Sequence, residues 1–415
     1  MSMGAKTTKT TVAVTRTADP FSPELVTKAV DEALRLVPGW RGKAAAAERI
    51  VVKPNLTADN VGWETGVVTS TLVMDAVLGA LRAANPRAEL TVAEATAVGL
   101  DTKKAFARVG LAETAARHRA RLADLNDDEH LPVSIPGGAI LKKVYIARTV
   151  LEADFLVDVP VLKTHAGVGI TVAMKNLKGT MPAREKKRFH NTGLIDCIVD
   201  LNRVVKPALV VADGTVALEG DGPVGGTPVN FGVIVAGTHT AAVDLVAGRL
   251  MGFAPDEIDA LRRALELGQG VPEEDIAVVG ESVAAVARPF KRAVFPFEHP
   301  DNVCIVDGKA CTGCREGLRI AIDRAKAQEV LALLPRVGFF IGPGAKVGPE
   351  DAAHPERNVI IGKCLKDAAN KGQGRWVPGC PPQIFLITDE MREMAGKDRL
   401  FGRKKDFIVE DDDDH

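Results

Sequence analysis

The sequence predicts an α/β protein with mainly parallel sheets flanked by helices, arranged as two α/β domains with a cleft between them. Short apolar runs such as residues 49–55 and 155–159 have strand-like chemistry, and they alternate with stretches of helical periodicity such as 23–34 and 69–84. This alternation is typical of βαβ units and a parallel sheet. The length of 415 residues exceeds one ordinary core, and a hydrophobic content of 46% is ample for burial.

The same periodicities give the expected elements in chain order. We expect strands at residues 11–16, 49–55, 90–93, 155–159, 207–213, 231–237 and 275–279, and later at 303–306, 337–341 and 358–362. We expect helices at 23–34, 69–84, 102–108, 111–121, 194–204, 240–251, 255–267 and 316–333. Ser22 is the expected N-cap of the first helix, because its hydroxyl can accept a hydrogen bond from a free N–H of the first turn.

A change of composition near residues 287–300 predicts a domain boundary. This stretch carries three prolines and three phenylalanines without helical period. We therefore expect an α/β domain at 1–285, a linker at 286–302, a C-terminal α/β domain at 303–409 and an acidic tail at 410–415.

Charge and aromatic content exclude several classes of partner. The 53 basic and 54 acidic residues nearly cancel, and only one Tyr and three Trp are present, so we expect no nucleic acid. No apolar run is long enough to span a bilayer, and the N-terminus lacks a signal-peptide core, so we expect no membrane and a cytoplasmic location. Neither GxGxxG nor a P-loop occurs, so no nucleotide cofactor is indicated.

Polar side chains that follow apolar runs predict a binding pocket. In an open α/β sheet, ligands collect beyond the carboxyl ends of strands. The candidates for substrate or cofactor binding are Lys53, Asn55, Lys163, Thr164, Asn176, Lys178 and Gly179. The residues expected to act in catalysis at the same site are His165, Lys175, His190, Asp213 and Glu219, with a histidine as proton donor and Lys175 as an anion holder or covalent nucleophile. A lysine-rich surface loop is the alternative.

Two further groups of charged residues extend this prediction. The basic run at 184–188 with His190 is expected to hold an anionic substrate, or else to be a solvated lid or an oligomer contact, so a homodimer is one assembly that it allows. Asp213, at the end of a predicted strand, and Glu219 are expected to form the acidic side of the pocket, with a tight turn as the alternative. Glu94 is expected in the crevice or in solvent, and Asp244 is expected to be paired or to face the pocket.

Three motifs resemble a known family. The runs "VVKPNL" from residue 51, "DVPVLKTHAGVGITVAMKNLKG" from residue 158 and "VVADGTVALEGDGPVGG" from residue 210 resemble domain-of-unknown-function family 362 (DUF362) over roughly residues 10–280. Members are often fused to iron–sulfur modules, so the resemblance implies redox chemistry. A weaker resemblance is to the N-terminal domain of the nickel-pincer lactate racemases, in which a His in a Gly-rich loop precedes the Lys that tethers the cofactor. It implies corresponding roles for His165, Lys175 and His190.

The six cysteines predict a metal centre in the second domain. Cys197 and Cys304 lie in apolar segments and are expected to pack as small hydrophobes. The other four, Cys311, Cys314, Cys364 and Cys380, follow predicted strands and supply the ligands that a [4Fe–4S] cluster requires. The Gly-Cys-Pro-Pro ending resembles the small iron–sulfur subunits of quinone-reducing complexes and hydrogenases. Structural zinc is the competing interpretation, although it usually pairs two Cys-x-x-Cys knuckles.

These features support three hypotheses of function. The leading one is a reductase that passes electrons from the cluster to a small, anionic substrate or a second cofactor in the Lys/His-lined pocket. The second is a non-catalytic electron-transfer or cofactor-delivery protein with a dedicated redox partner protein. The third is an isomerase or hydrolase that uses His165 and Lys175 beside a purely structural metal site.

Overall fold

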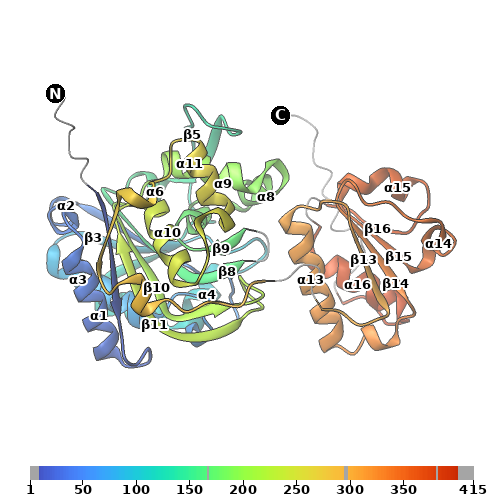
Figure 1. Ribbon diagram of the computed structural model, residues 1–415, viewed down its shortest axis with the longest axis horizontal. Helices are drawn as coiled ribbons and strands as arrows, with labels where there is room; N and C mark the ends of the chain where they lie inside the picture. Colours follow the sequence, from blue (N-terminus) through green and yellow to red (C-terminus); the bar gives the residue numbers. More distant parts are fainter. Residues whose placement is uncertain (1–8, 166–167, 294–297, 380–381, 401–415) are drawn as a thin grey trace. The chain divides into compact units, whose positions relative to one another are not determined.

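The computed structural model describes residues 9–165, 168–293, 298–379 and 382–400 (Figure 1). The chain divides into two compact units, Met1–Ala293 and Val294–His415. This division falls inside the segment predicted as a linker, and each unit has its own sheet. The expected cleft between the domains stays a prediction.

A ten-stranded sheet organises the first unit. Its strands are β1 (Thr10–Arg16), β2 (Arg49–Pro54), β3 (Glu89–Glu94), β4 (Ala120–Asp124), β7 (Phe155–Val159), β8 (Val161–His165), β9 (Gly169–Thr171), β10 (Leu209–Glu219), β11 (Thr227–Gly237) and β12 (Ile276–Gly280). The main order is β12-β1-β11-β10-β7-β2-β3-β4, and β8 pairs with β10 and β9. Neighbours from β10 to β4 are parallel, whereas β11 is antiparallel to β1 and β10. Strands β5 (His130–Ser134) and β6 (Lys143–Ala147) form a separate antiparallel pair.

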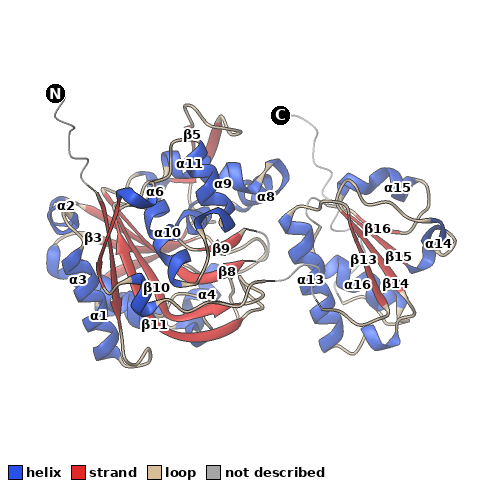
Figure 2. Cartoon of the chain, in the orientation of Figure 1, coloured by secondary structure: helices blue, strands red, loops and turns tan. Residues whose placement is uncertain are grey.

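Helices cover both faces of this sheet (Figure 2). One hydrophobic core contains residues of α1 (Pro23–Leu36), α2 (Trp40–Ala46), α3 (Thr71–Ala84), α4 (Thr102–Val109) and α5 (Leu111–Arg117). The other contains residues of α6 (Arg148–Leu151), α7 (Ala173–Asn176), α8 (Ala183–Thr192), α9 (Leu194–Val204), α10 (Thr240–Leu250), α11 (Asp259–Glu266) and α12 (Val283–Val286). Side chains alternate along a strand, so Val12 and Val14 enter one core and Ala13 the other.

A smaller parallel sheet organises the second unit. Strands β13 (Val303–Asp307), β14 (Val337–Ile341), β15 (Asn358–Ile361) and β16 (Arg375–Val377) lie in sequence order, and all three pairings are parallel. Helices α13 (Thr312–Ala327) and α16 (Ile384–Met394) share a core on one face. Helix α15 (Lys366–Asn370) packs on the other face, and α14 (Pro349–Ala352) precedes β15. The predicted fold class, α/β with mainly parallel sheets, is confirmed.

Several predicted elements agree with the structure, and Ser22 caps α1 by accepting a hydrogen bond from the Leu25 N–H at 3.3 Å. The helix predicted at 111–121 is wrong in its second half. Helix α5 ends at Arg117, and Arg119 adopts a left-handed φ of 53° that starts β4 instead. In the same way, the helix predicted at 316–333 begins earlier, at Thr312, and ends at Ala327, shortly before Glu329 with its φ of 56°.

Three boundaries near the predicted pocket also differ. Residues 163–165 were expected to follow a strand, but they lie within β8, because the chain resumes an extended course after Pro160 and pairs with β10. Strand β10 does not end at Asp213 and continues, with a bulge after Gly214, to Glu219. The helix predicted at 255–267 divides into a short 3₁₀ turn, η3 (Pro255–Glu257), and α11. Within the described residues, no helix is long and apolar enough to cross a membrane.

Candidate functional site

The carboxyl ends of three adjacent parallel strands bring ionisable side chains together in the first unit. Lys53 is near the end of β2, Glu94 ends β3, and Asp158 is near the end of β7. The strand order β7-β2-β3 makes them neighbours, and Lys53 lies opposite Asp158 in the register. All three are buried, Lys53 and Asp158 completely. Charged groups at this depth must be paired or neutral.

Lys53 and Glu94 satisfy this requirement as an ion pair. Lys53 Nζ donates to Glu94 Oε2 at 2.8 Å and to the carbonyl of Pro54 at 2.9 Å. Burial raises the pKa of Glu94, although the charges of Lys53 and Lys186 oppose that rise. Gly179 closes over the pair, because a Cβ there would lie only 1.8 Å from Glu94 Oε1. The glycine of the Lys-Gly motif is therefore required by packing.

A chain of hydrogen bonds links Lys163 to Asp158 through two amides. Lys163 Nζ donates to Asn55 Oδ1 at 2.6 Å, and Asn55 Nδ2 donates to Asn176 Oδ1 at 2.9 Å. Asn176 Nδ2 then donates to Asp158 Oδ1 at 2.8 Å. Burial raises the pKa of Asp158 to about 8, and its Oδ2 has no hydrogen-bond partner among the described residues. At neutral pH this carboxyl group therefore carries a proton.

Lys163 is held by three oxygen acceptors. Besides Asn55 Oδ1, its Nζ reaches the Val67 carbonyl at 2.8 Å and Thr57 Oγ1 at 3.1 Å. Burial, followed by the charge of Lys175, lowers the pKa of Lys163 well below its usual value. The three acceptors match the three N–H bonds of an ammonium group, so we take Lys163 as protonated in this arrangement.

Lys175 lies among three other basic side chains, those of His165, Lys178 and His190, and we call these four residues the Lys175 group. His165 ends β8 and is buried, Lys175 lies on α7, and Lys178 Nζ is 3.0 Å from His190 Nε2. Burial lowers the pKa of both histidines well below the usual value, and the charges of Lys175 and Lys178 add to this effect. The histidines are therefore neutral at physiological pH. A bound anion would offset these positive charges and raise both pKa values.

Helix α7 is positioned by Asp244 from α10. Asp244 accepts hydrogen bonds from the backbone N–H groups of Ala173 (2.7 Å) and Met174 (3.1 Å), which are free donors at the start of the helix. Burial raises the pKa of Asp244 to about 7. Of the two expectations for this residue, it is the paired one that the structure bears out, and the pairing fixes the helix that carries Lys175.

Three other predicted residues have contacts elsewhere. Asp213 accepts from the N–H of Ser70 (2.8 Å), the N-cap of α3, and from the N–H and hydroxyl of Thr215 (2.9 and 2.6 Å). Glu219 accepts from the Lys291 N–H at 3.2 Å. Thr164 donates to the Gly220 carbonyl at 2.7 Å. These three residues thus have partners of their own on and just after β10, at the start of α3 and in the segment near residue 291.

The basic run predicted at 184–188 lies on α8 and is only partly solvated. Lys186 is buried and donates to the carbonyls of Ala95 (2.6 Å) and Thr96 (2.7 Å), and burial lowers its pKa to about 8. Arg188 pairs with Glu185 at 2.7 Å. Lys186 thus ties α8 to the loop that follows β3, next to the Lys53–Glu94 pair.

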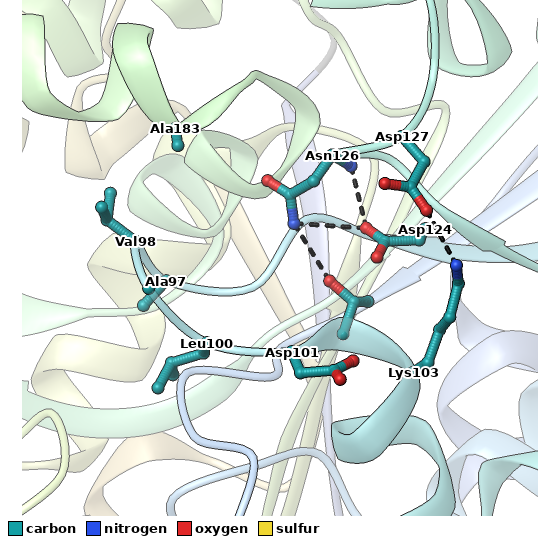
Figure 3. Close-up of a pocket in the computed structure, with 11 residues that line it drawn as sticks. Ala97, Val98, Leu100, Asp101, Lys103, Asp124, Asn126, Asp127 and Ala183 are labelled. Atoms are coloured by element: carbon teal, nitrogen blue, oxygen red, sulfur yellow. Dashed lines mark hydrogen bonds and ion pairs between the residues drawn. The ribbon is translucent and has the colours of Figure 1, made fainter.

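That loop also lines an open groove of about 450 Å³ (Figure 3). Its walls are residues 97–103, Asp124, Asn126, Asp127 and Ala183. The polar groups are largely bound to one another: Asn126 Nδ2 donates to Thr102 Oγ1 and to Asp124 Oδ1, and Lys103 pairs with Asp127. None of the residues predicted as site residues lines this groove.

The second unit brings cysteine loops together at the carboxyl edge of its sheet. Cys311 is the N-cap of α13, and Cys314 lies in its first turn. A hydrogen bond with the Cys314 thiol, helped by backbone N–H groups and opposed by burial, lowers the pKa of Cys311 to about 6. Burial raises the pKa of the Cys364 thiol, and the neighbouring charge of Cys311 raises it further. The thiol groups of these three residues are thus close enough to influence one another.

Gly362 marks the point where these sulfurs approach. A Cβ on this residue would lie 3.4 Å from Cys364 Sγ, 3.7 Å from Cys314 Sγ and 3.8 Å from the Gly379 carbonyl oxygen. Within the described ranges, no set of three or more His, Cys, Asp or Glu side chains is arranged to hold a metal ion. Cys380, the fourth predicted ligand, follows Gly379 directly and lies outside the described residues. Soft sulfur donors of this kind suit an iron–sulfur centre or zinc.

The first unit is therefore an α/β domain with a buried, lysine- and histidine-rich site at one sheet edge. Residues 50–249 match the family described as "Domain of unknown function (DUF362)". This range contains all the described site residues of the first unit from Lys53 to Asp244, so the site lies within the part of the chain that matches this family. The family resemblance predicted from the sequence is confirmed.

Two individual proteins are also similar to parts of the chain. Over 129 residues it is 29% identical to the thylakoid-associated protein sll1697 of Synechocystis sp., an alignment that spans 30% of this chain and 40% of that protein. The chain thus matches less than half the length of this relative. The structure of the lactate racemase apoprotein from Thermoanaerobacterium thermosaccharolyticum aligns with 61% of this chain and 60% of its own, with 15% identity and a TM-score of 0.41.

The sequence analysis missed two members of the site. Asp158 was treated only as part of the strand that precedes the pocket, and Lys186 only as one of a basic run. The signal for Asp158 was its place as the single charged residue in a five-residue run that is otherwise apolar. Nothing in the local pattern distinguishes Lys186 from Lys187, because only the packing of α8 buries one and exposes the other.

Proposed function

We propose that the protein is an iron–sulfur reductase. Cys311, Cys314, Cys364 and Cys380 would hold a [4Fe–4S] cluster, which supplies electrons one at a time when it is bound. The substrate, or a second cofactor, would be a small anion bound by the Lys175 group of the first unit. A cytoplasmic location and a redox partner protein that delivers electrons are parts of this proposal.

The observation that carries the proposal is the approach of three cysteines to one another beside Gly362. The sulfurs of Cys314 and Cys364 border the position of a Cβ on Gly362, and Cys311 contacts Cys314. The loops that carry the third and fourth predicted ligands are joined, because Gly362 N–H bonds to the Val377 carbonyl at 2.9 Å and Lys363 N–H to the Gly379 carbonyl at 3.0 Å. This pairing keeps Gly379, the residue that precedes Cys380 in the sequence, beside the segment that carries Cys364.

The residues of the first unit supply binding and proton donation in this proposal. Lys175 and Lys178 present positive charge to a carboxylate or phosphate group, and His165 and His190 lie beside them as neutral donors or acceptors. The neutral state of the histidines changes the role expected for His165. Asp158, which keeps its proton to about pH 8, is the better proton donor at neutral pH.

Metal analysis of anaerobically purified protein tests the proposal. We expect iron and acid-labile sulfide in equal amounts and an EPR signal after reduction. The Cys311→Ser and Cys380→Ser variants should lose both, whereas Cys304→Ser, in the same unit but outside the predicted ligand set, should keep them. Zinc without iron or labile sulfide would refute the proposal.

One observation favours a second candidate, an acid–base isomerase with a structural metal site. Neutral His165 and protonated Asp158 are an available base and an available acid within one network of charges around Lys175 and Lys53. Turnover that survives Cys311→Ser in a folded protein would favour this candidate. Loss of turnover in the same variant, together with loss of iron, favours the reductase. Iron-dependent electron exchange with a partner protein, without any turnover of a small molecule, would instead identify a non-catalytic electron-transfer protein.

A further inference from the structure

We infer that Asp307 is a positioning residue for the cysteine centre and sets the charge around it. This inference rests on the proposed iron–sulfur function. Asp307 ends β13, four residues before Cys311, and only 19% of its side chain is exposed. It is not among the residues that the sequence pattern identified.

The two oxygens of Asp307 hold the two flanks of the Cys-x-x-Cys segment. Oδ1 accepts from the N–H of Ala310, the residue before Cys311, at 2.7 Å. Oδ2 accepts a hydrogen bond from Nε of Arg315, the residue after Cys314, at 2.7 Å and forms an ion pair with Nη2 at 2.7 Å. A single carboxylate therefore fixes the entry and the exit of the segment that carries two of the three described cysteines of the centre.

The backbone that leads into this segment packs closely against the loop after β14. Gly342 follows β14 with a φ of 85°, and a Cβ on it would lie 2.3 Å from the Ala310 nitrogen. Gly308 N–H bonds to the Ile341 carbonyl at 2.8 Å, and Gly344 N–H bonds to the Gly308 carbonyl at 2.8 Å. The loop after β13 therefore lies directly on the loop after β14, and Asp307 determines how the Cys311 turn leaves it.

The same contact sets the local charge. Arg315 follows Cys314 directly, and Asp307 pairs with its guanidinium through one hydrogen bond and a second ion-pair contact to the same oxygen. Removing the carboxylate charge makes the total charge next to the sulfur ligands more positive by one unit, whatever else Arg315 contacts. Positive charge favours the reduced, more negative form of a cluster, so the reduction potential should rise.

Two variants separate the two roles. Asp307→Asn keeps an oxygen acceptor for the Ala310 N–H but loses the negative charge, so we expect near-normal iron loading with a reduction potential shifted to more positive values. Asp307→Ala loses both contacts. Residues that orient metal ligands contribute about 10-fold or more to metal affinity, so we expect chelators to remove iron from this variant about 10-fold faster than from the wild type.

Asp351→Asn is the matched control. Asp351, on α14, pairs with Arg336 at 2.6 Å and has 13% of its side chain exposed. Arg336 directly precedes β14 and therefore lies at the sheet edge opposite the cysteines. We expect this variant to match the wild type in iron loading, chelator resistance and potential.

The experiment uses the full chain, reconstituted anaerobically with iron and sulfide. Iron and sulfide content, chelator-dependent loss of absorbance and an EPR-monitored redox titration are measured for each variant, with circular dichroism as the test of folding. If Asp307→Ala does not fold, the potential of Asp307→Asn alone decides the inference. The inference is overturned if Asp307→Asn has the same reduction potential as Asp351→Asn and Asp307→Ala has the same chelator resistance. A wild type that takes up neither iron nor sulfide would overturn the proposed function itself.

Discussion

Lys53 and Glu94 form an ion pair of 2.8 Å in which the lysine side chain is completely buried and the glutamate side chain is 4% exposed. The two residues come from adjacent strands and meet at the carboxyl edge of the sheet. The pair stands at the base of the predicted site, between Asp158 on one side and Lys186 on the other. Four predictions follow from this arrangement and its surroundings.

Glu94→Gln should lower the free energy of unfolding by about 3–5 kcal/mol, because it leaves the Lys53 ammonium buried without a counter-charge. Urea unfolding at neutral pH measures this change. Asp127→Asn, which breaks the exposed Lys103–Asp127 pair of similar length, is the control and should cost no more than about 1 kcal/mol. Equal effects of the two substitutions would contradict the role of burial.

Gly179→Ala should destabilise the protein by about 1–3 kcal/mol or more, because the new methyl group would overlap Glu94 Oε1 and lie 2.7 Å from Lys53 Nζ. Gly42→Ala is a suitable control, since a Cβ on this helical glycine meets nothing within 4 Å. We expect that control to be neutral or slightly stabilising. Thermal unfolding of both variants checks the prediction, which fails if Gly179→Ala unfolds at the wild-type temperature.

Asp158 should make the protein less stable as the pH rises. Its pKa is about 8 in the folded state and about 3.9 in an unfolded chain, so the folded state binds the extra proton between these values. Stability therefore falls with rising pH through this window, by at most about 1.4 kcal/mol for each pH unit from this group. Asp158→Asn should remove this contribution, so its stability relative to the wild type should increase from about pH 4 to about pH 8.

Asp75→Asn gives the control of opposite sign for this experiment. Burial tends to raise the pKa of Asp75, but hydrogen bonds with His118 and Arg117 outweigh burial and lower it. The stability that Asp75 contributes is present at neutral pH and is lost as the pH falls into the acid range. Urea unfolding of both variants across the pH range measures the two slopes. A pH-independent difference between Asp158→Asn and the wild type would show that Asp158 is ionised in the folded state.

Asp213→Ala should affect stability more than the chemistry of the Lys175 group. The substitution leaves the N–H groups of Ser70 and Thr215 and the Thr215 hydroxyl without their acceptor, so we expect a loss of about 2–4 kcal/mol. The structural role of Asp213 is tested by measuring two quantities for the variant and the wild type: the free energy of unfolding and the affinity of the folded protein for inorganic phosphate. A variant of wild-type stability that no longer binds the anion bound by the wild type would instead support the catalytic role first expected for Asp213.

The sequence by itself determined the fold class and the identity of most site elements. The spacing of apolar residues and the composition were enough to predict the strand at 155–159 and the helix at 194–204. The reason is that apolar residues recur with the repeat of the element whose face they bury. The Lys-Asn-Leu-Lys-Gly motif and the cysteine spacing singled out residues 175–179 and the cysteine loops without any structure. Both can be recognised without a structure because they are defined by residue identities and spacing along the chain.

Only the tertiary structure decided which of these residues meet. Asp213 looked like a pocket residue but accepts hydrogen bonds from Ser70, at the start of α3, and from Thr215, whereas Asp158 looked like part of a strand but lies in the charged network. Strand order determined the outcome for Asp158, because residues 53, 94 and 158 become neighbours only when β7, β2 and β3 pair. The protonation states of His165 and Asp158 depend in turn on burial and on lysine charges supplied by other elements, which no local pattern encodes.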